Sequence, residues 1–227
     1  MIILLLFLTG QDLRNELKSQ FYPQRSTEYY TSRVVMYNEA DCYKNMVYLL
    51  YSGGRVDWTC HAQIIPNSAT INAEHIVPQS LFKEKLPMRA DLHHLYSSGA
   101  KENNYRSNFP FTEVPYASCI KFGKNNTWFE TMPSNPDDYS CYTQNPIRAF
   151  MPIKKDRGIV ARAVLYFQTI YPDVDISSIN NISLFKKWNE EYPPSELEIF
   201  RNEIINITQG NRNPYIDNPV LVNRAFP

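Results

Sequence analysis

The chain has 227 residues, of which 43% are hydrophobic and 20% are charged, an ordinary composition for a globular protein with a substantial core. Its 23 Lys and Arg residues balance 23 Asp and Glu residues, so the formal net charge is zero. A neutral chain has no global positive field, which argues against a protein that coats a polyanion by neutralising many phosphates at once. Any nucleic-acid site must therefore be a local patch, and the length fits one domain.

The chain starts with an apolar run from Met1 to Gly10 that is too short to cross a bilayer. Its length suits the hydrophobic region of a secretory signal. We therefore predict a signal segment over residues 1–10, a single domain over residues 11–227 and no membrane anchor. A truncated start or an ordinary buried segment is the alternative.

From residue 11 to residue 50 we predict helices with short extended pieces, because Leu13, Leu17 and Phe21 follow a helical spacing. The middle of the chain, from about residue 56 to 155, is rich in Pro, Asn, Ser and Tyr. Its apolar runs have the length of strands and show no sustained helical period. We expect the chemistry to lie in this middle part.

Three of the four histidines lie in two short strings, Glu74-His75-Ile76-Val77-Pro78 and Asp91-Leu92-His93-His94-Leu95-Tyr96. A polar run from Lys101 to Asn108 follows, long enough for one or two helical turns between Gly99 and Pro110. The implied order is strand, strand, helix.

This order places the groups that phosphodiester hydrolysis requires near one another: a base, a cation site and a second positive group. A neutral histidine can take a proton near pH 7, and Glu and Asn oxygens suit Mg²⁺. Asn103 and Arg106 lie three residues apart and so share one helix face. The structural alternative is a buried network of hydrogen bonds.

Strand geometry limits which of these side chains can share a site. His93 and His94 point to opposite faces of a strand, so at most one of them can face it. Glu74 and His75 are also neighbours, and they can meet at one site only if the strand is bulged or Glu74 reaches round its edge.

Two helices are predicted in the last third of the chain. Gly158 to Tyr171 carries apolar residues on one face, which indicates a buried helix that ends before Pro172. Ser195 and Glu198 form a capping-box pattern at the start of a second helix, and Gly210 is its predicted stop.

The four cysteines, Cys42, Cys60, Cys119 and Cys141, fit disulfides better than a zinc site, because none lies in a CxxC or CxxH arrangement. They allow three pairings, and we take the pairing of near neighbours, Cys42 with Cys60 and Cys119 with Cys141, as the working hypothesis. Reduced, buried thiols are the alternative.

Sequons for N-glycosylation begin at Asn125, Asn181 and Asn206, although the segment around Asn206 has a helical pattern. Sequons matter only in a eukaryotic secretory route. Together with the apolar start and the paired cysteines, they favour a secreted protein.

The sequence motifs formed by several of these residues resemble those of the bacterial endonuclease I family. The resemblance is carried by Glu74-His75 with Pro78, by Asp91-Leu92-His93-His94-Leu95, and by Asn103 with Arg106-Ser107-Asn108. It continues through Gly158-Ile159-Val160-Ala161-Arg162-Ala163 and Gln209-Gly210-Asn211-Arg212-Asn213-Pro214, and covers roughly residues 70 to 220. It implies an α+β, mostly helical single domain built around a ββα-metal, or His-Me finger, core over about residues 71–109.

The resemblance also implies an activity, that of a Mg²⁺-dependent endonuclease that hydrolyses DNA, with RNA as a further substrate and little sequence specificity. His75 would activate water as the general base, Glu74 and Asn103 would be the metal ligands, and the products would carry 5′-phosphate. Mn²⁺ and Ca²⁺ are the other candidate ions. We expect a monomer.

The family's phosphate-binding loop arginine has no aligned counterpart here. Arg106 and Arg89 are the candidates to supply that charge to the phosphate. Arg106 has a structural alternative, because it could brace the helix against a buried carboxylate such as Asp91.

Two other functions stay open at this point. The chain could be a secreted binding or structural protein that keeps the nuclease fold without the activity. It could also be a zinc hydrolase that uses His93, His94 and Glu74, although adjacent histidines seldom converge on one ion and no HExxH helix is present.

Overall fold

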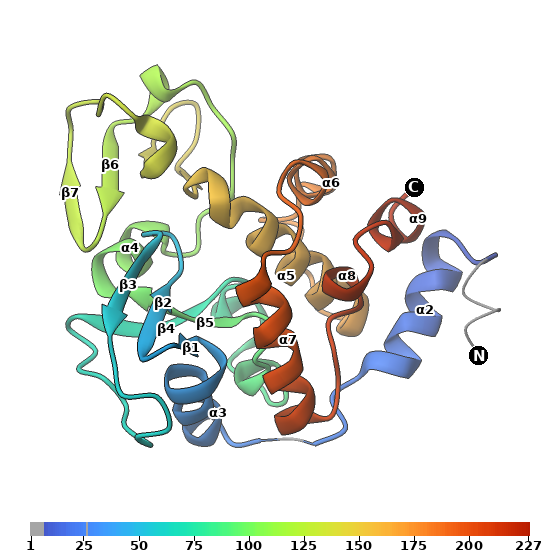
Figure 1. The fold of residues 1–227 in the computed structure, drawn as a ribbon. Helices are drawn as coiled ribbons and strands as arrows, with labels where there is room; N and C mark the ends of the chain where they lie inside the picture. The colour runs from blue at the N-terminus through green and yellow to red at the C-terminus, as the bar shows by residue number, and fades with distance from the viewer. Residues whose placement is uncertain (1–6, 26) are drawn as a thin grey trace.

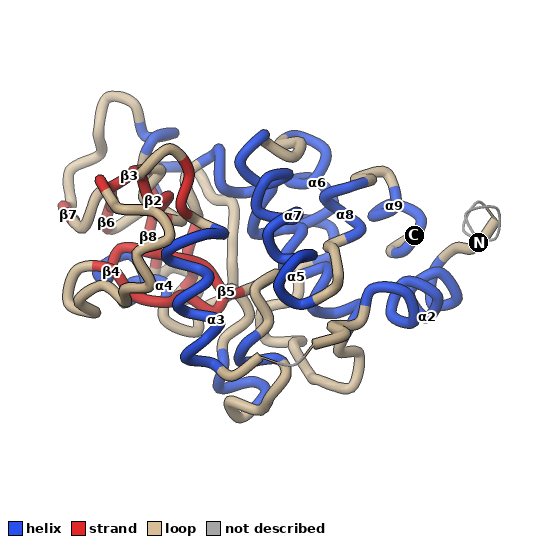
Figure 2. The backbone as a smooth tube through the Cα atoms, turned by 60° about the horizontal axis from the view of Figure 1, so that its bottom comes forward, coloured by secondary structure: helices blue, strands red, loops and turns tan. Residues whose placement is uncertain are grey.

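The computed structural model describes residues 7–25 and 27–227, so residues 1–6 of the predicted signal segment lie outside the described residues. The fold is α+β, as predicted, with small antiparallel sheets in one half of the molecule and a helical half beside them (Figures 1 and 2). The helices are α2 (Gly10–Phe21), α3 (Tyr29–Val35), α4 (Ala100–Arg106), α5 (Arg157–Ile170), α6 (Ile182–Glu191), α7 (Glu196–Gln209), α8 (Pro214–Asp217) and α9 (Leu221–Ala225). The strands are β1 (Cys42–Tyr43), β2 (Met46–Leu49), β3 (Gly54–Asp57), β4 (Ile71–His75), β5 (Leu95–Gly99), β6 (Lys121–Lys124), β7 (Thr127–Phe129), β8 (Ser140–Thr143) and β9 (Ala149–Met151).

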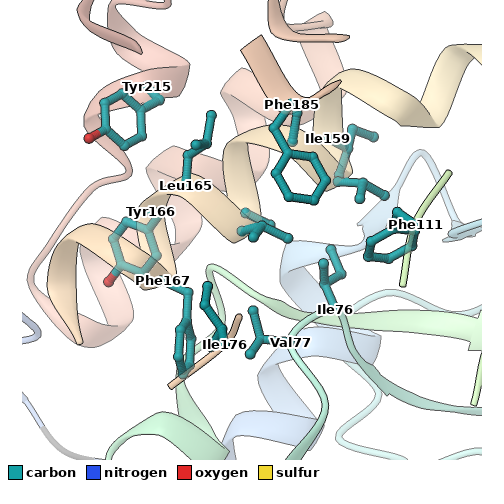
Figure 3. Close-up of a cluster of buried hydrophobic side chains, with 14 of the residues drawn as sticks. Ile76, Val77, Phe111, Ile159, Leu165, Tyr166, Phe167, Ile176, Phe185 and Tyr215 are labelled. Carbon is teal, nitrogen blue, oxygen red and sulfur yellow. The ribbon is translucent and has the colours of Figure 1, made fainter. Parts of the chain in front are cut away.

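Helix α5 forms the centre of the core, which confirms the prediction made from its apolar face. Every residue of α5 except Gln168 is buried. Ile76 and Val77, which directly follow β4, are fully buried in the same cluster as the apolar side chains of α5 (Figure 3). Burial of each such side chain contributes about 1.5–3 kcal/mol. The core therefore anchors the end of β4, where the predicted site begins.

Helix α7 begins and ends where the sequence predicted. The hydroxyl of Ser195 accepts a hydrogen bond from the backbone N–H of Glu198 at 3.3 Å, and Gly210 ends the helix with a φ of 75°. The second half of the predicted capping box is wrong. The carboxylate of Glu198 instead binds Nε and Nη2 of Arg162 at 2.6 Å each. A buried guanidinium without a counter-charge costs more free energy than the loss of one capping hydrogen bond.

Replacing Ser195 by alanine is expected to lower the free energy of unfolding by about 1 kcal/mol, because it leaves one N–H at the start of α7 without an acceptor. Urea unfolding followed by circular dichroism measures this change. Ser195→Asp should recover the stability, since Asp also caps helices, whereas an equal loss in both variants would contradict the capping role.

The strands form three small antiparallel sheets, in the orders β1-β2-β3, β4-β5 and β7-β6-β8-β9. Both predicted disulfides are confirmed: Cys42 pairs with Cys60, and Cys119 pairs with Cys141. The first ties β1 to the loop after β3, and the second ties β8 to the segment before β6. Each therefore closes one of the loop-rich regions around a small sheet.

Helix α7 also holds β5 in place. Arg201 donates from Nη1 to the carbonyl of Leu92 at 2.7 Å and from Nη2 to that of Leu95, while its Nε binds Asp41 at 2.6 Å. The other carboxylate oxygen of Asp41 accepts the N–H of Ser97. This buried network joins the helical half to the strand next to the predicted site.

Of the sequon asparagines, Asn125 and Asn181 are exposed, and Asn206 is partly buried within α7. Glycosylation at these positions stays a prediction. Within residues 7–25 and 27–227, no helix is both long and apolar enough to cross a membrane.

Candidate active site

The predicted order of strand, strand and helix is present between residues 71 and 106. Strands β4 and β5 pair antiparallel from Ile71 with Gly99 to His75 with Leu95. Helix α4 starts directly after Gly99, the last residue of β5, and contacts both strands (Figure 1). Glu74, His75 and Asn103 line one polar cavity of about 340 Å³. Two neighbouring residues of β4 and one residue of α4 thus face a common space.

The neighbours Glu74 and His75 share this cavity without a bulge, because β4 and β5 pair residue for residue up to His75. The strand ends at His75, and the chain bends there before the buried Ile76 and Val77. The end of the strand therefore permits what a regular interior position would not.

His75 is held as a neutral base. It is 6% exposed, and its Nε2 lies 2.9 Å from the backbone carbonyl of Arg89. A carbonyl only accepts, so Nε2 carries the proton and Nδ1 keeps its lone pair. Among the described residues Nδ1 has no hydrogen-bond partner. Burial, and then the nearby His94, lowers the pKa of His75 from 6.5 to about 3, so the ring is uncharged at neutral pH.

Glu74 is a buried carboxylate with one oxygen held and one left over. Its Oε1 accepts a hydrogen bond from the Tyr51 hydroxyl at 2.8 Å and lies 3.5 Å from Nε of Arg106. Its Oε2 has no partner in the described part of the chain. Burial raises the pKa of Glu74 from 4.5 to about 7, although Arg106 and the Tyr51 hydrogen bond act in the opposite direction.

Asn103 presents its amide oxygen to the same cavity. Its Nδ2 donates to Oδ1 of Asn72 at 2.7 Å and to the carbonyl of Ala73 at 3.2 Å. Because both partners are acceptors, the nitrogen is fixed towards the strand, and Oδ1 is left without a donor among the residues described. Glu74 and Asn103 thus offer two hard oxygens in one polar cavity, the donor type that Mg²⁺ prefers.

Arg106 faces the protein interior. It is 0% exposed, and its guanidinium donates to the carbonyls of Ser107 and Phe109 from Nη1 and to that of Ile76 from Nη2. Arg106 is not among the described residues that line the cavity. This geometry matches the structural alternative for Arg106, but the carboxylate that it braces is Glu74.

Asp91, the brace first considered for Arg106, has other partners. Its carboxylate accepts hydrogen bonds from Tyr166, Tyr171 and Gln209. The acidic partner was therefore wrongly predicted, because three side chains from α5, α7 and the segment after α5 already satisfy Asp91.

Arg89 contributes through both its backbone and its side chain. Its carbonyl fixes the ring of His75, as described above. Its guanidinium pairs with Glu84 at 3.0 Å and lies 4.4 Å from the centre of the Tyr29 ring. The side chain is about one third exposed, and its contact with a phosphate stays a prediction.

The other two central histidines point apart. Nε2 of His94 donates to the carbonyl of Met88 at 2.7 Å, and Nε2 of His93 faces the carbonyl of Asn211 at 3.3 Å. In the part of the chain that the structure describes, no group of three His, Cys, Asp or Glu residues is close enough to hold a metal ion. This arrangement argues against the zinc hydrolase.

Sequence reasoning missed Asn72 and Tyr51. Asn72 and Glu74 are two apart on β4 and so lie on one face, which is a usable signal for Asn72. Tyr51 reaches Glu74 from 23 residues away, and nothing in its local sequence announces this contact.

Comparisons with known proteins identify the family and several relatives of the chain. The chain matches the family model described as Endonuclease I over residues 9–220. It is similar to an extracellular ribonuclease of Bacillus amyloliquefaciens, with 26% identity over 166 residues, 65% of this chain and 51% of the relative. It is also similar to a periplasmic deoxyribonuclease of Aeromonas hydrophila, with 27% identity over 168 residues, 66% of this chain and 64% of the relative. The chain thus spans about half to two thirds of the length of these curated relatives.

Proposed function

This chain belongs to the endonuclease I family, and from that premise we propose that it is a secreted, divalent-metal-dependent endonuclease that hydrolyses the phosphodiester bonds of DNA and RNA. One observation carries the proposal. A neutral histidine with a free Nδ1 lies in the same cavity as two oxygens, Oε2 of Glu74 and Oδ1 of Asn103, that have no donor among the described residues.

The role proposed for His75 is to take the proton from the attacking water. Its Nδ1 is the available lone pair, and the carbonyl of Arg89 keeps the ring in the tautomer and orientation that this step needs. When bound by Glu74 and Asn103, Mg²⁺, or Mn²⁺ or Ca²⁺ in its place, would neutralise the charge that develops on the phosphate.

Tyr51 and Arg106 act on Glu74 as positioning residues. Both contact Oε1, so the carboxylate cannot rotate freely and Oε2 stays directed away from them. We do not propose Arg106 as a replacement for the family's phosphate-binding loop arginine, because its guanidinium is buried and bound to backbone carbonyls.

The substrate class rests on the same reasoning. The relatives include a ribonuclease and a deoxyribonuclease. Contacts to a phosphodiester backbone read no base edges, which suits low sequence specificity. We propose that the 3′ oxygen is the leaving group, so that the products carry 5′-phosphate ends. Export is supported by the two disulfides and by relatives named as extracellular or periplasmic. We propose that the enzyme acts as a monomer.

The purified protein is expected to cut supercoiled plasmid and structured RNA in millimolar Mg²⁺ and to cut neither in excess EDTA. DNA ligase should rejoin the cut DNA without prior phosphorylation, because the 5′ ends carry phosphate. A chelator selective for zinc should leave the activity intact. If disulfide-intact protein cuts neither substrate with Mg²⁺, Mn²⁺ or Ca²⁺, the chain is instead an inactive binding protein that retains the fold.

A further inference from the structure

Two arginines share one aromatic ring directly beside His75. The ring of Tyr29, at the start of α3, stacks on that of His75 with centroids 5.6 Å apart and planes inclined by 29°. The guanidinium carbon of Arg33, one turn later on α3, lies 4.9 Å from the centre of the Tyr29 ring, and that of Arg89 lies 4.4 Å from it. We call Tyr29, Arg33 and Arg89 the arginine–tyrosine cluster.

Within the described residues the cluster carries net positive charge, because Arg89 has a paired carboxylate and Arg33 has none. The side chain of Arg33 has no ion pair or hydrogen bond among residues 7–25 and 27–227, and its Nε is buried without a partner. Nε of Arg89 is likewise buried and has no hydrogen-bond partner in the described part of the chain, while its Nη2 pairs with the carboxylate of the exposed Glu84 at 3.0 Å. Two guanidiniums that lie 4.4 and 4.9 Å from the centre of one ring repel each other, and an anion bound beside them would relieve that repulsion.

The geometry indicates which anion fits. A guanidinium binds phosphate through paired N–H donors, and it keeps its charge at any physiological pH. The ring of Tyr29 is already covered by His75 and the two arginines, so it orients the guanidiniums and does not offer a free face to a base. In a chain of zero net charge, this is the kind of local patch that a polyanion requires.

Resting on the proposed function, we propose that the arginine–tyrosine cluster binds a second phosphate of the nucleic-acid strand that is cut at His75. A single aromatic ring separates the two sites. Because phosphates follow one another every ~3.4 Å along the axis of each strand, a strand placed at His75 reaches the cluster within a few nucleotides. Arg33 and Arg89 are the donors, and Tyr29 holds them in position.

The salt dependence of DNA binding tests this inference. Binding of a fluorescent duplex by wild type, Arg33→Ala and Arg89→Ala is measured in EDTA over a series of NaCl concentrations. Each lost phosphate contact lowers the slope of log Kd against log salt by about 0.9, which corresponds to roughly tenfold weaker binding at 0.1 M salt. Arg33→Lys keeps the charge and should keep most of the slope.

Two further variants separate this role from a general loss of charge or structure. Arg14→Ala is the matched control, since Arg14 also lies over an aromatic ring, 5.0 Å from that of Phe226, but on α2, away from α3 (Figures 1 and 2). Its slope should equal that of wild type. Glu84→Gln should tighten binding, because it releases Arg89 and removes a carboxylate from the path of the strand.

Steady-state cleavage gives a second readout. Arg33→Ala should raise KM with kcat unchanged, the pattern expected when a contact is made equally in the ground state and the transition state. If wild type cuts DNA while both alanine variants keep its salt slope and its KM, this inference is wrong and the proposed function stands. If wild type neither binds nor cuts nucleic acid, the proposed function fails, and the inference fails with it.

Discussion

Replacing His75 by alanine is expected to slow cleavage of supercoiled plasmid by about a hundred- to ten-thousandfold, the range that a general base contributes. The reason is geometric. Nδ1 of His75 is the free lone pair in a cavity that also presents Oε2 of Glu74 and Oδ1 of Asn103. Alanine leaves the oxygens in place and removes the acceptor for the water proton. A single-turnover assay with saturating Mg²⁺ measures the change in the cleavage step.

The His75 variant must be shown to be folded, because the ring packs against Tyr29, Phe82 and His94. Urea unfolding and near-ultraviolet circular dichroism supply that check. His61→Asn is the matched control: His61 is exposed, and asparagine tolerates its φ of 67°. Partial recovery of the alanine variant by added imidazole would identify the missing group as a base. Cleavage at the wild-type rate by folded His75→Ala would place the base elsewhere.

The parts of the fold that follow local rules could be predicted from the sequence. The apolar period of α5, the cap at Ser195 and the stop at Gly210 all appear where local chemistry put them. The order of β4, β5 and α4 was predictable for the same reason, because two apolar strings are followed by a short polar run that Gly99 and Pro110 bracket. Each of these features depends on residues only a few positions apart.

The parts of the site that depend on distant contacts could not be predicted. The acceptor that fixes the ring of His75 is the backbone carbonyl of Arg89, and a carbonyl has no residue type to recognise. Tyr51 follows β2, and Glu74 lies on β4, the partner strand of β5. The two residues meet only because β2 and β5 come together in the fold. Arg106 shows the same limit, because its residue type does not reveal whether the guanidinium is buried or faces a substrate.

The second large effect is expected at Glu74, where glutamine should stabilise the metal-free protein and abolish cleavage. The pKa of Glu74 is about 7 in the folded protein against 4.5 ordinarily. Because the pKa of Glu74 is raised in the folded protein, the contribution of this side chain to the free energy of unfolding is fully present below pH 4.5 and is lost as the pH rises to about 7. Above pH 7 the ionised side chain is therefore a cost of about 3 kcal/mol. Glutamine stays neutral and can still accept the hydrogen bond from Tyr51.

Thermal unfolding in EDTA from pH 4 to pH 8.5 tests this prediction, with the exposed Glu130→Gln as control. The advantage of Glu74→Gln should be near zero below pH 4.5 and should reach roughly 5–10 °C in Tm above pH 7. The difference between variants is needed because the lowered pKa of His75 gives the wild-type curve an opposite slope at acid pH. Added Mg²⁺ should stabilise wild type and leave Glu74→Gln unchanged. A glutamine variant less stable than wild type at pH 8 would mean that Arg106 already compensates the charge, and a carboxylate so neutralised would have little need of a cation.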